Sequence, residues 1–157
     1  MILVQNCRMI DPASQTDSLR DILIGEDRIT KIAEAGTINP AQITKEKEDE
    51  LRILNADGLI AAPGLVDTHV HFRDPGAEYK EDILTGAVSA AAGGVTSVVL
   101  MANTNPHVDK EETLSYVLGK GAKTGIHVYT CANVTMDMEG DELTDMGALA
   151  KAAEAGF

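Results

Sequence analysis

The stretch GLVDTHVHFRDPG, residues 64–76, is the most informative part of this sequence. Its apolar start predicts a buried strand, and His69 and His71 stand two residues apart towards the end of that strand. Side chains at positions i and i+2 of a strand point to the same face, so both imidazoles can reach one metal ion. Arg73 lies two residues further along and could hold an anionic substrate beside the metal. The combination predicts hydrolytic chemistry.

A histidine pair alone is a moderate signal, because two histidines on a strand can also be hydrogen-bonded core residues. Three features favour a metal site. The pair lies at the C-terminal end of its predicted strand, where barrel enzymes build their sites. The turn Asp74-Pro75-Gly76 follows, and Arg73 would be costly to bury without an anion. Asp67 shares the face and could either support the ligands by hydrogen bonds or only shape the strand.

A second candidate is Asn103, in the segment MANTNP at residues 101–106, which follows the next predicted strand. Its amide offers both donors and acceptors and could bind an amide or a carboxylate. The alternative is an asparagine that caps its own backbone in a turn, and this segment taken alone favours the turn. His107 is expected in an exposed loop and His127 at the far end of a third strand, so neither is assigned to a metal.

Composition and charge limit the class of protein. The chain has 157 residues, of which 44% are hydrophobic, enough for one core of ordinary size. A net charge of -12 argues against a nucleic-acid partner. Cys7 and Cys131 are expected to be reduced thiols. Neither a signal peptide nor an apolar run of roughly 18 residues is present, so we expect a cytoplasmic protein with no membrane partner.

Residues 1–62 predict a small β segment. Short strands are expected over residues 2–4, 51–54 and 59–62, with a hairpin over residues 21–32. Alternating isoleucines on the two arms of the hairpin, with a polar turn between them, support that prediction. The charged run at residues 45–50 predicts a solvated loop or face.

From Pro63 onward, strands and helices alternate. Strands are predicted over residues 65–71, 95–101 and 126–132, and helices over residues 80–92, 109–123 and 145–155. Gly93-Gly94 and Gly156 are expected to end the first and third helices. Asp109 is expected to cap the second helix, on which Leu114, Val117 and Leu118 share one apolar face. A strand about every thirty residues is the spacing of a βαβ unit.

Three βα units are too few to close a (β/α)8 barrel, which takes about 250 residues. We therefore predict an α/β fold that is the N-terminal part of a TIM-type barrel, preceded by a small β-sandwich segment. The expected division is residues 1–62 for part of a composite β domain and residues 63–157 for the first units of the barrel. A doubly wound three-layer fold is the alternative.

The segment PGLVDTHVH, residues 63–71, resembles the N-terminal motif of the amidohydrolase superfamily. Its continuation FRDPG, together with MANTNP at residues 101–106, is similar to the bacterial type I dihydroorotases. Allantoinases and hydantoinases share the two histidines but typically lack the arginine at this place. The resemblance covers the chain from the N-terminal β segment to the last residue. One position departs from it, since the family usually has proline where Ala102 stands.

The resemblance implies that His69 and His71 bind one or two zinc ions, and that His71, Arg73 and Asn103 contact a carboxylate-bearing substrate. The implied reaction is the reversible cyclisation of N-carbamoyl-L-aspartate to L-dihydroorotate in de novo pyrimidine biosynthesis. In the hydrolytic direction a zinc-activated water attacks the ring amide. The family's bridging carboxylate, its later histidine ligands and its catalytic aspartate are expected beyond Phe157. The chain is therefore expected to be an N-terminal portion, inactive alone.

Two alternatives stay open. The first is another cyclic amidohydrolase, such as an allantoinase or a hydantoinase. The second is a non-catalytic dihydroorotase-like subunit of a transcarbamoylase complex, against which the intact pair His69 and His71 argues. The resemblance is compatible with a homodimer or with association with a transcarbamoylase, and the sequence fixes neither the oligomeric state nor the number of zinc ions.

Overall fold

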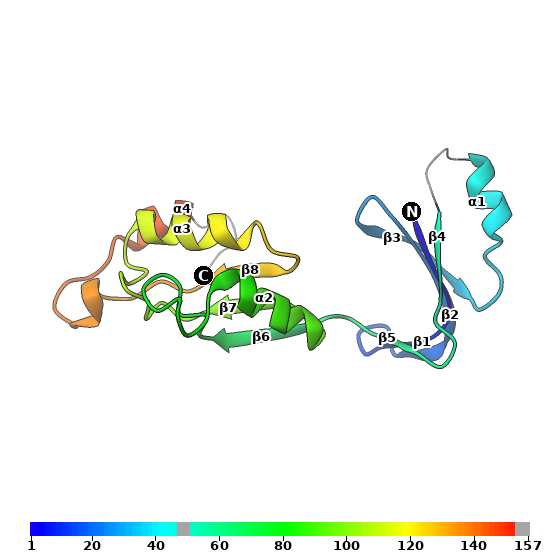
Figure 1. Ribbon diagram of the computed structural model, residues 1–157, viewed down its shortest axis with the longest axis horizontal. Coiled ribbons are helices and arrows are strands. Elements are labelled where there is room, and N and C mark those ends of the chain that lie inside the picture. The colour runs from blue at the N-terminus through cyan, green and yellow to red at the C-terminus, as the bar shows by residue number, and fades with distance from the viewer. Residues whose placement is uncertain (47–50, 153–157) are drawn as a thin grey trace. The chain divides into compact units, whose positions relative to one another are not determined.

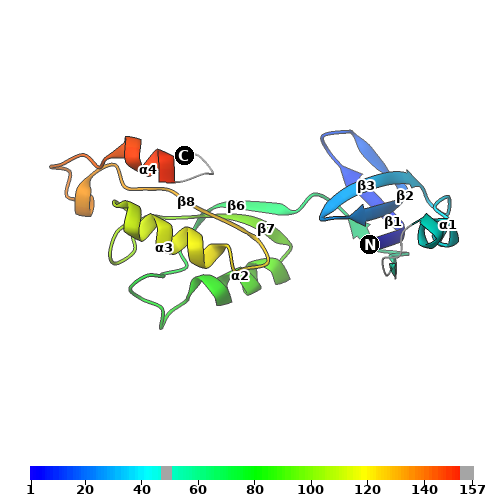
Figure 2. The same cartoon turned by 90° about the horizontal axis from the view of Figure 1, so that it is seen from above.

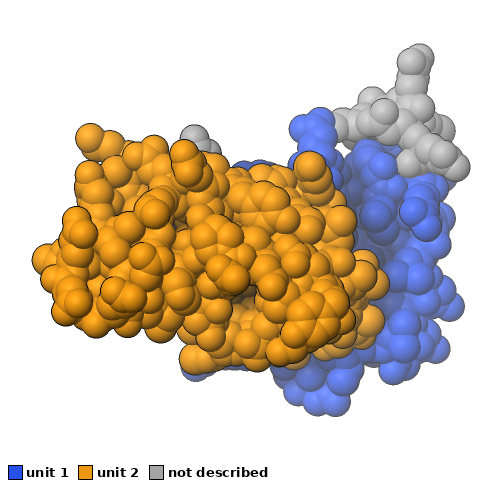
Figure 3. All heavy atoms as spheres, turned by 60° about the vertical axis from the view of Figure 1, so that its left-hand side comes forward, with its two compact units in different colours: residues 1–63 blue, residues 64–157 orange. Residues whose placement is uncertain are grey.

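The computed structural model describes residues 1–46 and 51–152. The chain divides into two compact units, Met1–Pro63 and Gly64–Phe157 (Figure 3). Each unit has its own sheet.

The first unit is a five-stranded sheet in the order β3-β2-β1-β4, with β5 paired to β1 (Figure 1). Its elements are β1 (Ile2–Asp11), β2 (Thr16–Gly25), β3 (Arg28–Glu34), α1 (Pro40–Glu46), β4 (Arg52–Asn55) and β5 (Ile60–Ala61). Strand β1 is longer than predicted, because its pairing with β2 resumes after an irregularity between Val4 and Cys7. The described residues of this unit form a single sheet, so the β-sandwich stays a prediction.

The predicted hairpin is confirmed. Strands β2 and β3 run antiparallel, with Ile22 opposite Ile32 and Ile24 opposite Ile29. The turn between them has positive φ at Glu26 (52°) and at the residue after it (60°), as a type I′ turn requires. Of the charged run predicted at residues 45–50, residues 47–50 lie outside the described part of the chain.

The second unit is built on a parallel sheet in the order β6-β7-β8. Its elements are β6 (Leu65–Val70), α2 (Ile83–Ala92), β7 (Val95–Leu100), α3 (Glu111–Gly121), β8 (His127–Thr130), the 3-10 turn η1 (Met136–Met138) and α4 (Met146–Ala152). Helix α2 packs on β7 and α3 on β8, and α3 also contacts both α2 and α4 (Figures 1 and 2). The predicted alternation of strands and helices is therefore present.

The ends of the first predicted helix follow from its caps. Helix α2 begins later than residues 80–92 predicted, because the carboxylate of Asp82 accepts hydrogen bonds from the N–H groups of Leu84 (2.7 Å) and Thr85 (2.9 Å). After the helix, Gly94 adopts φ +81°, so the glycine pair ends it as expected.

The cap predicted for the second helix is wrong. Helix α3 follows Lys110, whose side chain makes no capping hydrogen bond within the described part of the chain. The carboxylate of Asp109 instead accepts a hydrogen bond from the N–H group of Asp137, at 2.9 Å, and so holds the loop after β8. The predicted end of the third helix at Gly156 lies outside the described residues.

The core of the second unit lies between the sheet and its helices. Leu114 and Val117 of α3, predicted to share an inward face, are 1% and 0% exposed. They pack with Val98 and Leu100 of β7 and with Ile83 of α2. This core fixes the positions of the carboxyl ends of the three strands. None of the described helices has the length and apolar composition needed to cross a membrane.

Strand β6 differs from its prediction. We expected a buried strand, yet Leu65 and Val66 are 61% and 62% exposed. The reason is topological: β6 is the edge of the described sheet and pairs only with β7. An apolar run shows which surface a strand is suited to cover, whereas burial depends on the neighbours that are present.

Candidate functional site

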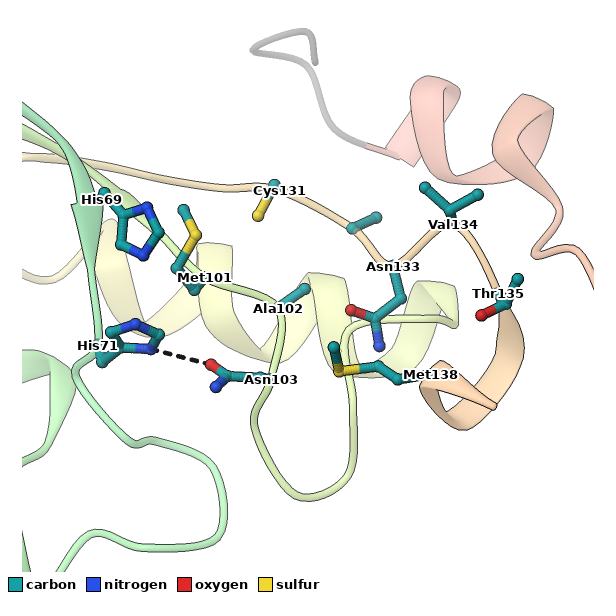
Figure 4. A pocket seen from close by; sticks show the side chains of 11 residues that line it. His69, His71, Met101, Ala102, Asn103, Cys131, Asn133, Val134, Thr135 and Met138 are labelled. Carbon is teal, nitrogen blue, oxygen red and sulfur yellow. Dashed lines mark hydrogen bonds between the residues drawn. The ribbon is translucent and has the colours of Figure 1, made fainter. Parts of the chain in front are cut away.

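A pocket of about 470 Å³ lies where the parallel strands β6, β7 and β8 end (Figure 4). It is lined by His69, His71, Met101, Ala102, Asn103, Cys131, Ala132, Asn133, Val134, Thr135 and Met138. Parallel strands present their carboxyl ends at one edge of the sheet, so residues far apart in sequence meet there. Three predicted site residues line the pocket: His69, His71 and Asn103.

The two histidines lie side by side, as predicted. Their ring centroids are 5.3 Å apart with the ring planes at 65°. Both side chains are exposed. His69 belongs to β6, whereas His71 follows its last residue. The carboxylate of Asp67 accepts a hydrogen bond from the backbone N–H of His69 at 3.1 Å, so it shapes the end of the strand.

The side chain of Asn103, which follows β7, reaches His71, which follows the neighbouring strand β6. Its Oδ1 lies 2.9 Å from Nδ1 of His71 (Figure 4). Because an amide oxygen can only accept, Nδ1 is the donor in this contact, and in the neutral imidazole Nε2 is then the nitrogen whose lone pair can face a ligand. The turn-cap alternative, in which Asn103 would bind its own backbone, is therefore wrong. Ala102, at the position where proline was expected, is buried and leaves Asn103 in place.

Arg73 does not lie where the strand pattern put it. Strand β6 ends at Val70, and the backbone at Arg73 turns with φ +62°. Arg73 therefore does not continue the face of the two histidines, and its side chain is exposed rather than buried. The cost of burying an arginine, used above to favour an anion site, does not arise here.

The sequence reasoning missed a buried carboxylate next to Arg73. Asp74 is 0% exposed. It accepts hydrogen bonds from the N–H of Ile83 (3.1 Å), the hydroxyl of Tyr116 (2.9 Å) and Nζ of Lys120 (2.6 Å). In the sequence Asp74 looks like an ordinary turn residue before Pro-Gly. No local signal connects it to partners 42 and 46 residues away.

The contacts of Asp74 shift two pKa values upward. Its hydrogen bond to Lys120 favours the charged ammonium and raises the pKa of Lys120 above 10.5. Its hydrogen bond to Tyr116 favours the neutral phenol and raises the pKa of Tyr116 above 10.0. The three groups together form the Asp74 cluster: Asp74, Tyr116 and Lys120.

These shifts predict a loss of stability at alkaline pH. A folded pKa above the unfolded value stabilises the fold at lower pH, and this stabilisation is lost as pH rises from about 10 through the raised pKa values. We expect urea unfolding to show a lower free energy of unfolding at pH 11 than at pH 8. Lys120→Arg keeps the ion pair with a group that stays charged, so its loss should be smaller. An equal loss in both proteins would contradict this origin.

The far wall of the pocket was also missed. It comes from the end of β8 and the loop after it, and includes Asn133, Thr135 and Met138 (Figure 4). Asn133 is 9% exposed, and its buried Nδ2 finds no hydrogen-bond partner among the described residues. His107, expected to be exposed, is half-buried, while His127 begins β8 at its opposite end, as predicted.

The two histidines are an incomplete metal site. A catalytic zinc commonly has three protein ligands. Within residues 1–46 and 51–152, no three His, Cys, Asp or Glu side chains lie close enough together to hold a metal ion. His69 and His71 are thus the candidate metal ligands that the described part of the chain supplies. Cys131 also lines the pocket, but both cysteines are free thiols, as predicted.

Comparison with known proteins identifies the family. A family model described as "Dihydro-orotase-like" matches residues 58–157, which include both histidines and Asn103. This chain belongs to the dihydro-orotase-like family. The resemblance inferred from the motifs is therefore confirmed for the family.

Relatives agree with this assignment. Over all 157 residues the chain is 51% identical to a dihydroorotase of Streptococcus pyogenes serotype M1 and 50% identical to a dihydroorotase of Clostridioides difficile. It spans 35% of the length of each of these curated relatives.

Solved structures support the fold. An L-hydantoinase from Arthrobacter aurescens is similar with a TM-score of 0.66 at 22% identity, over 85% of this chain and 28% of the other. A D-hydantoinase from Thermus sp. is similar with a TM-score of 0.65 at 19% identity, over 90% of this chain and 29% of the other. At such identities the similarity shows a shared fold alone, and it agrees with the predicted α/β class.

Proposed function

We propose that this chain supplies part of the active site of a dihydroorotase. Such an enzyme interconverts N-carbamoyl-L-aspartate and L-dihydroorotate in de novo pyrimidine biosynthesis. The observation that carries the proposal is the meeting of His71 and Asn103, 32 residues apart, beside His69 in one pocket. Relatives named dihydroorotase, about half identical over the whole of this chain, support the substrate class.

The histidine pair fits zinc. A tetrahedral ion about 2.0–2.1 Å from one nitrogen of each imidazole puts the two ring centroids roughly 5 Å apart. The observed separation is 5.3 Å. Asn103 keeps Nε2 of His71 available as a ligand atom. When bound, zinc would supply an activated water and polarise the amide carbonyl. The number of ions, one or two, depends on the remaining ligands.

Arg73 and Asn103 would bind and orient the substrate. Arg73 is exposed, and its planar guanidinium suits a carboxylate. Asn103 uses Oδ1 for His71, while its Nδ2 can still donate to the substrate. The two side chains would hold the anionic end of the substrate beside His71 and so align its ring amide.

The remaining chemistry is proposed to come from residues outside these 157. With only a histidine pair among the described residues, we expect the bridging carboxylate, the later histidine ligands and the proton-transferring aspartate elsewhere in the enzyme. We accordingly propose residues 63–157 as the first βα units of a TIM-type barrel and residues 1–62 as part of a composite β domain. The chain by itself should not catalyse the reaction. A cytoplasmic location and a homodimer or a transcarbamoylase partner belong to the same proposal.

A hydantoinase-type activity is the second candidate, because hydantoinases share the histidine pair by resemblance and two of them share the fold of this chain. Arg73 distinguishes the two, because only dihydroorotate carries a carboxylate for it to bind. A non-catalytic subunit is less well supported, since both histidines are intact and adjacent.

The test is a chimera in which residues 1–157 replace the aligned first 35% of the Streptococcus pyogenes relative. We expect the chimera to hydrolyse dihydroorotate. Arg73→Ala should lower kcat/KM for dihydroorotate about 10²–10³-fold, because the carboxylate loses its charged partner. Hydrolysis of dihydrouracil, which lacks the carboxylate, should change little. The isolated chain is the inactive control.

Two results would overturn the proposal. An inactive chimera with bound zinc would contradict the assignment to dihydroorotase. The absence of any effect of Arg73→Ala on dihydroorotate hydrolysis would favour the hydantoinase-type alternative. Arg28→Ala, which removes an exposed arginine of β3, is the matched control for loss of positive charge.

A further inference from the structure

The Asp74 cluster has no role in the chemistry proposed above. Asp74 is completely buried and is paired with Lys120, whose side chain is 25% exposed. Capping of α2 explains only one of its three contacts, because Asp74 takes the N–H of Ile83 while Asp82 takes those of Leu84 and Thr85. A buried charge held by a long-range ion pair is expensive to maintain, so its contacts need another explanation.

The first clue is the backbone beside the cluster. Arg73 has φ +62°, a conformation uncommon in residues other than glycine. Such a conformation persists where the surrounding structure holds it. Asp74 is buried while Arg73 is exposed. Fixing the Asp74 carboxylate therefore sets the direction in which the side chain of the preceding residue, Arg73, leaves the loop.

The second clue is the contact between two loops. The carbonyl of Pro75 accepts a hydrogen bond from the N–H of Asn105 at 3.0 Å. Gly76 lies directly on Asn105, since a Cβ there would stand 2.7 Å from the Cβ of Asn105 and overlap its carbonyl oxygen. The loop that carries Arg73 is thereby seated on the loop that carries Asn103.

Together these contacts connect the substrate-binding candidates to α3. Tyr116 and Lys120 of α3 hold Asp74, and the turn after Asp74 holds Asn105. Helix α3 also follows the loop of Asn103 in the chain. That loop is therefore held at one side by α3 and at the other by the turn after Asp74.

We propose that Asp74, held by Tyr116 and Lys120, is a positioning residue that fixes Arg73 relative to Asn103 for binding of the substrate carboxylate. The inference rests on the proposed function of Arg73. Asp74 touches no substrate, and it acts through the backbone of the loop. Loss of orientation in a binding group lowers the rate even when the group itself is present.

The kinetic test uses the chimera and the isosteric variant Asp74→Asn. We expect kcat/KM for dihydroorotate to fall at least about tenfold, mainly through KM, while dihydrouracil hydrolysis and zinc content stay close to the unaltered chimera. In an Arg73→Ala background the same substitution should have little further effect. Tyr116→Phe and Lys120→Met should show a weaker form of the same pattern, and Lys120→Arg should retain most of the activity.

A second buried carboxylate gives the matched control. Asp109 is 5% exposed and binds the loop after β8 rather than the loop of Arg73. Asp109→Asn should therefore not discriminate between the two substrates. If Asp74→Asn lowered both activities equally, or cost as much in the Arg73→Ala background, Asp74 would be a general stabiliser and the proposal would be wrong.

Nuclear magnetic resonance of this chain separates the inference from the proposed function. Asp74→Asn should shift or broaden the amide signals of Arg73, Gly76 and Asn105, and Asp109→Asn should not. Unchanged signals would overturn the positioning role whatever the enzyme does. Shifted signals in this chain, together with a zinc-loaded but inactive chimera, would uphold the positioning of Arg73 and overturn the dihydroorotase assignment instead.

Discussion

His69→Ala in the chimera should abolish zinc-dependent hydrolysis of dihydroorotate, with a loss of about 10³-fold or more. The substitution removes one of the two imidazoles whose ring centroids lie 5.3 Å apart. With one of the two candidate ligands missing, His71 alone would hold the ion weakly, and the activated water that zinc would supply would be lost. Zinc content and rate should be measured on the same samples. Addition of zinc after chelation should restore the unaltered chimera and not the variant.

The control for this experiment is His127→Ala. His127 is also exposed and also lies on a strand, but it begins β8 at the end away from the pocket and stacks on Tyr129. Its removal should change neither zinc content nor rate. If His69→Ala kept both the metal and the activity, the histidine pair would not be the metal site.

Gly76→Ala should destabilise the second unit by about 2–6 kcal/mol, from backbone strain and overpacking together. Gly76 has φ +102°, which residues with a Cβ rarely adopt, and an added Cβ would overlap the backbone of Asn105. Neither the loop of Gly76 nor the loop of Asn105 can move away without loss of stability, because a backbone hydrogen bond joins them at this point. Urea unfolding of the chain measures the loss.

Two other glycines separate the contributions. Gly94 has φ +81°, and an added Cβ would meet none of the described residues, so the cost of Gly94→Ala comes from the backbone conformation alone. Gly119 lies in α3 with open space, and Gly119→Ala should stabilise by up to about 1 kcal/mol. If Gly76→Ala cost no more than Gly94→Ala, the close packing of the two loops would contribute nothing to stability.

The histidine pair could be predicted because its signal is local. Two residues at strand spacing share a face whatever surrounds them, and the position at the strand's end follows from the turn after it. The meeting of His71 with Asn103 is less local, yet parallel strands bring their carboxyl ends together by topology. The helix cores followed from periodicity, as Leu114 and Val117 show.

The parts that could not be predicted depend on partners distant in sequence. Arg73 was placed on the strand face because the alternation was continued past Val70, where the backbone leaves the strand. The burial of Asp74 depends on Tyr116 and Lys120, which no pattern near Asp74 announces. Asp109 was read as a helix cap because its position suited one, while its actual partner lies in another loop.

The hydrogen bond between His71 and Asn103 also connects the sequence variation that each position can accept. An aspartate at position 103 would pull harder on the Nδ1 proton and make the imidazole a stronger electron donor, whereas an aliphatic residue would release the tautomer. Either substitution at position 103 alters the electronic character of His71 although His71 itself is unchanged. Natural variation at one of these two positions should therefore be tolerated mainly when the other varies with it.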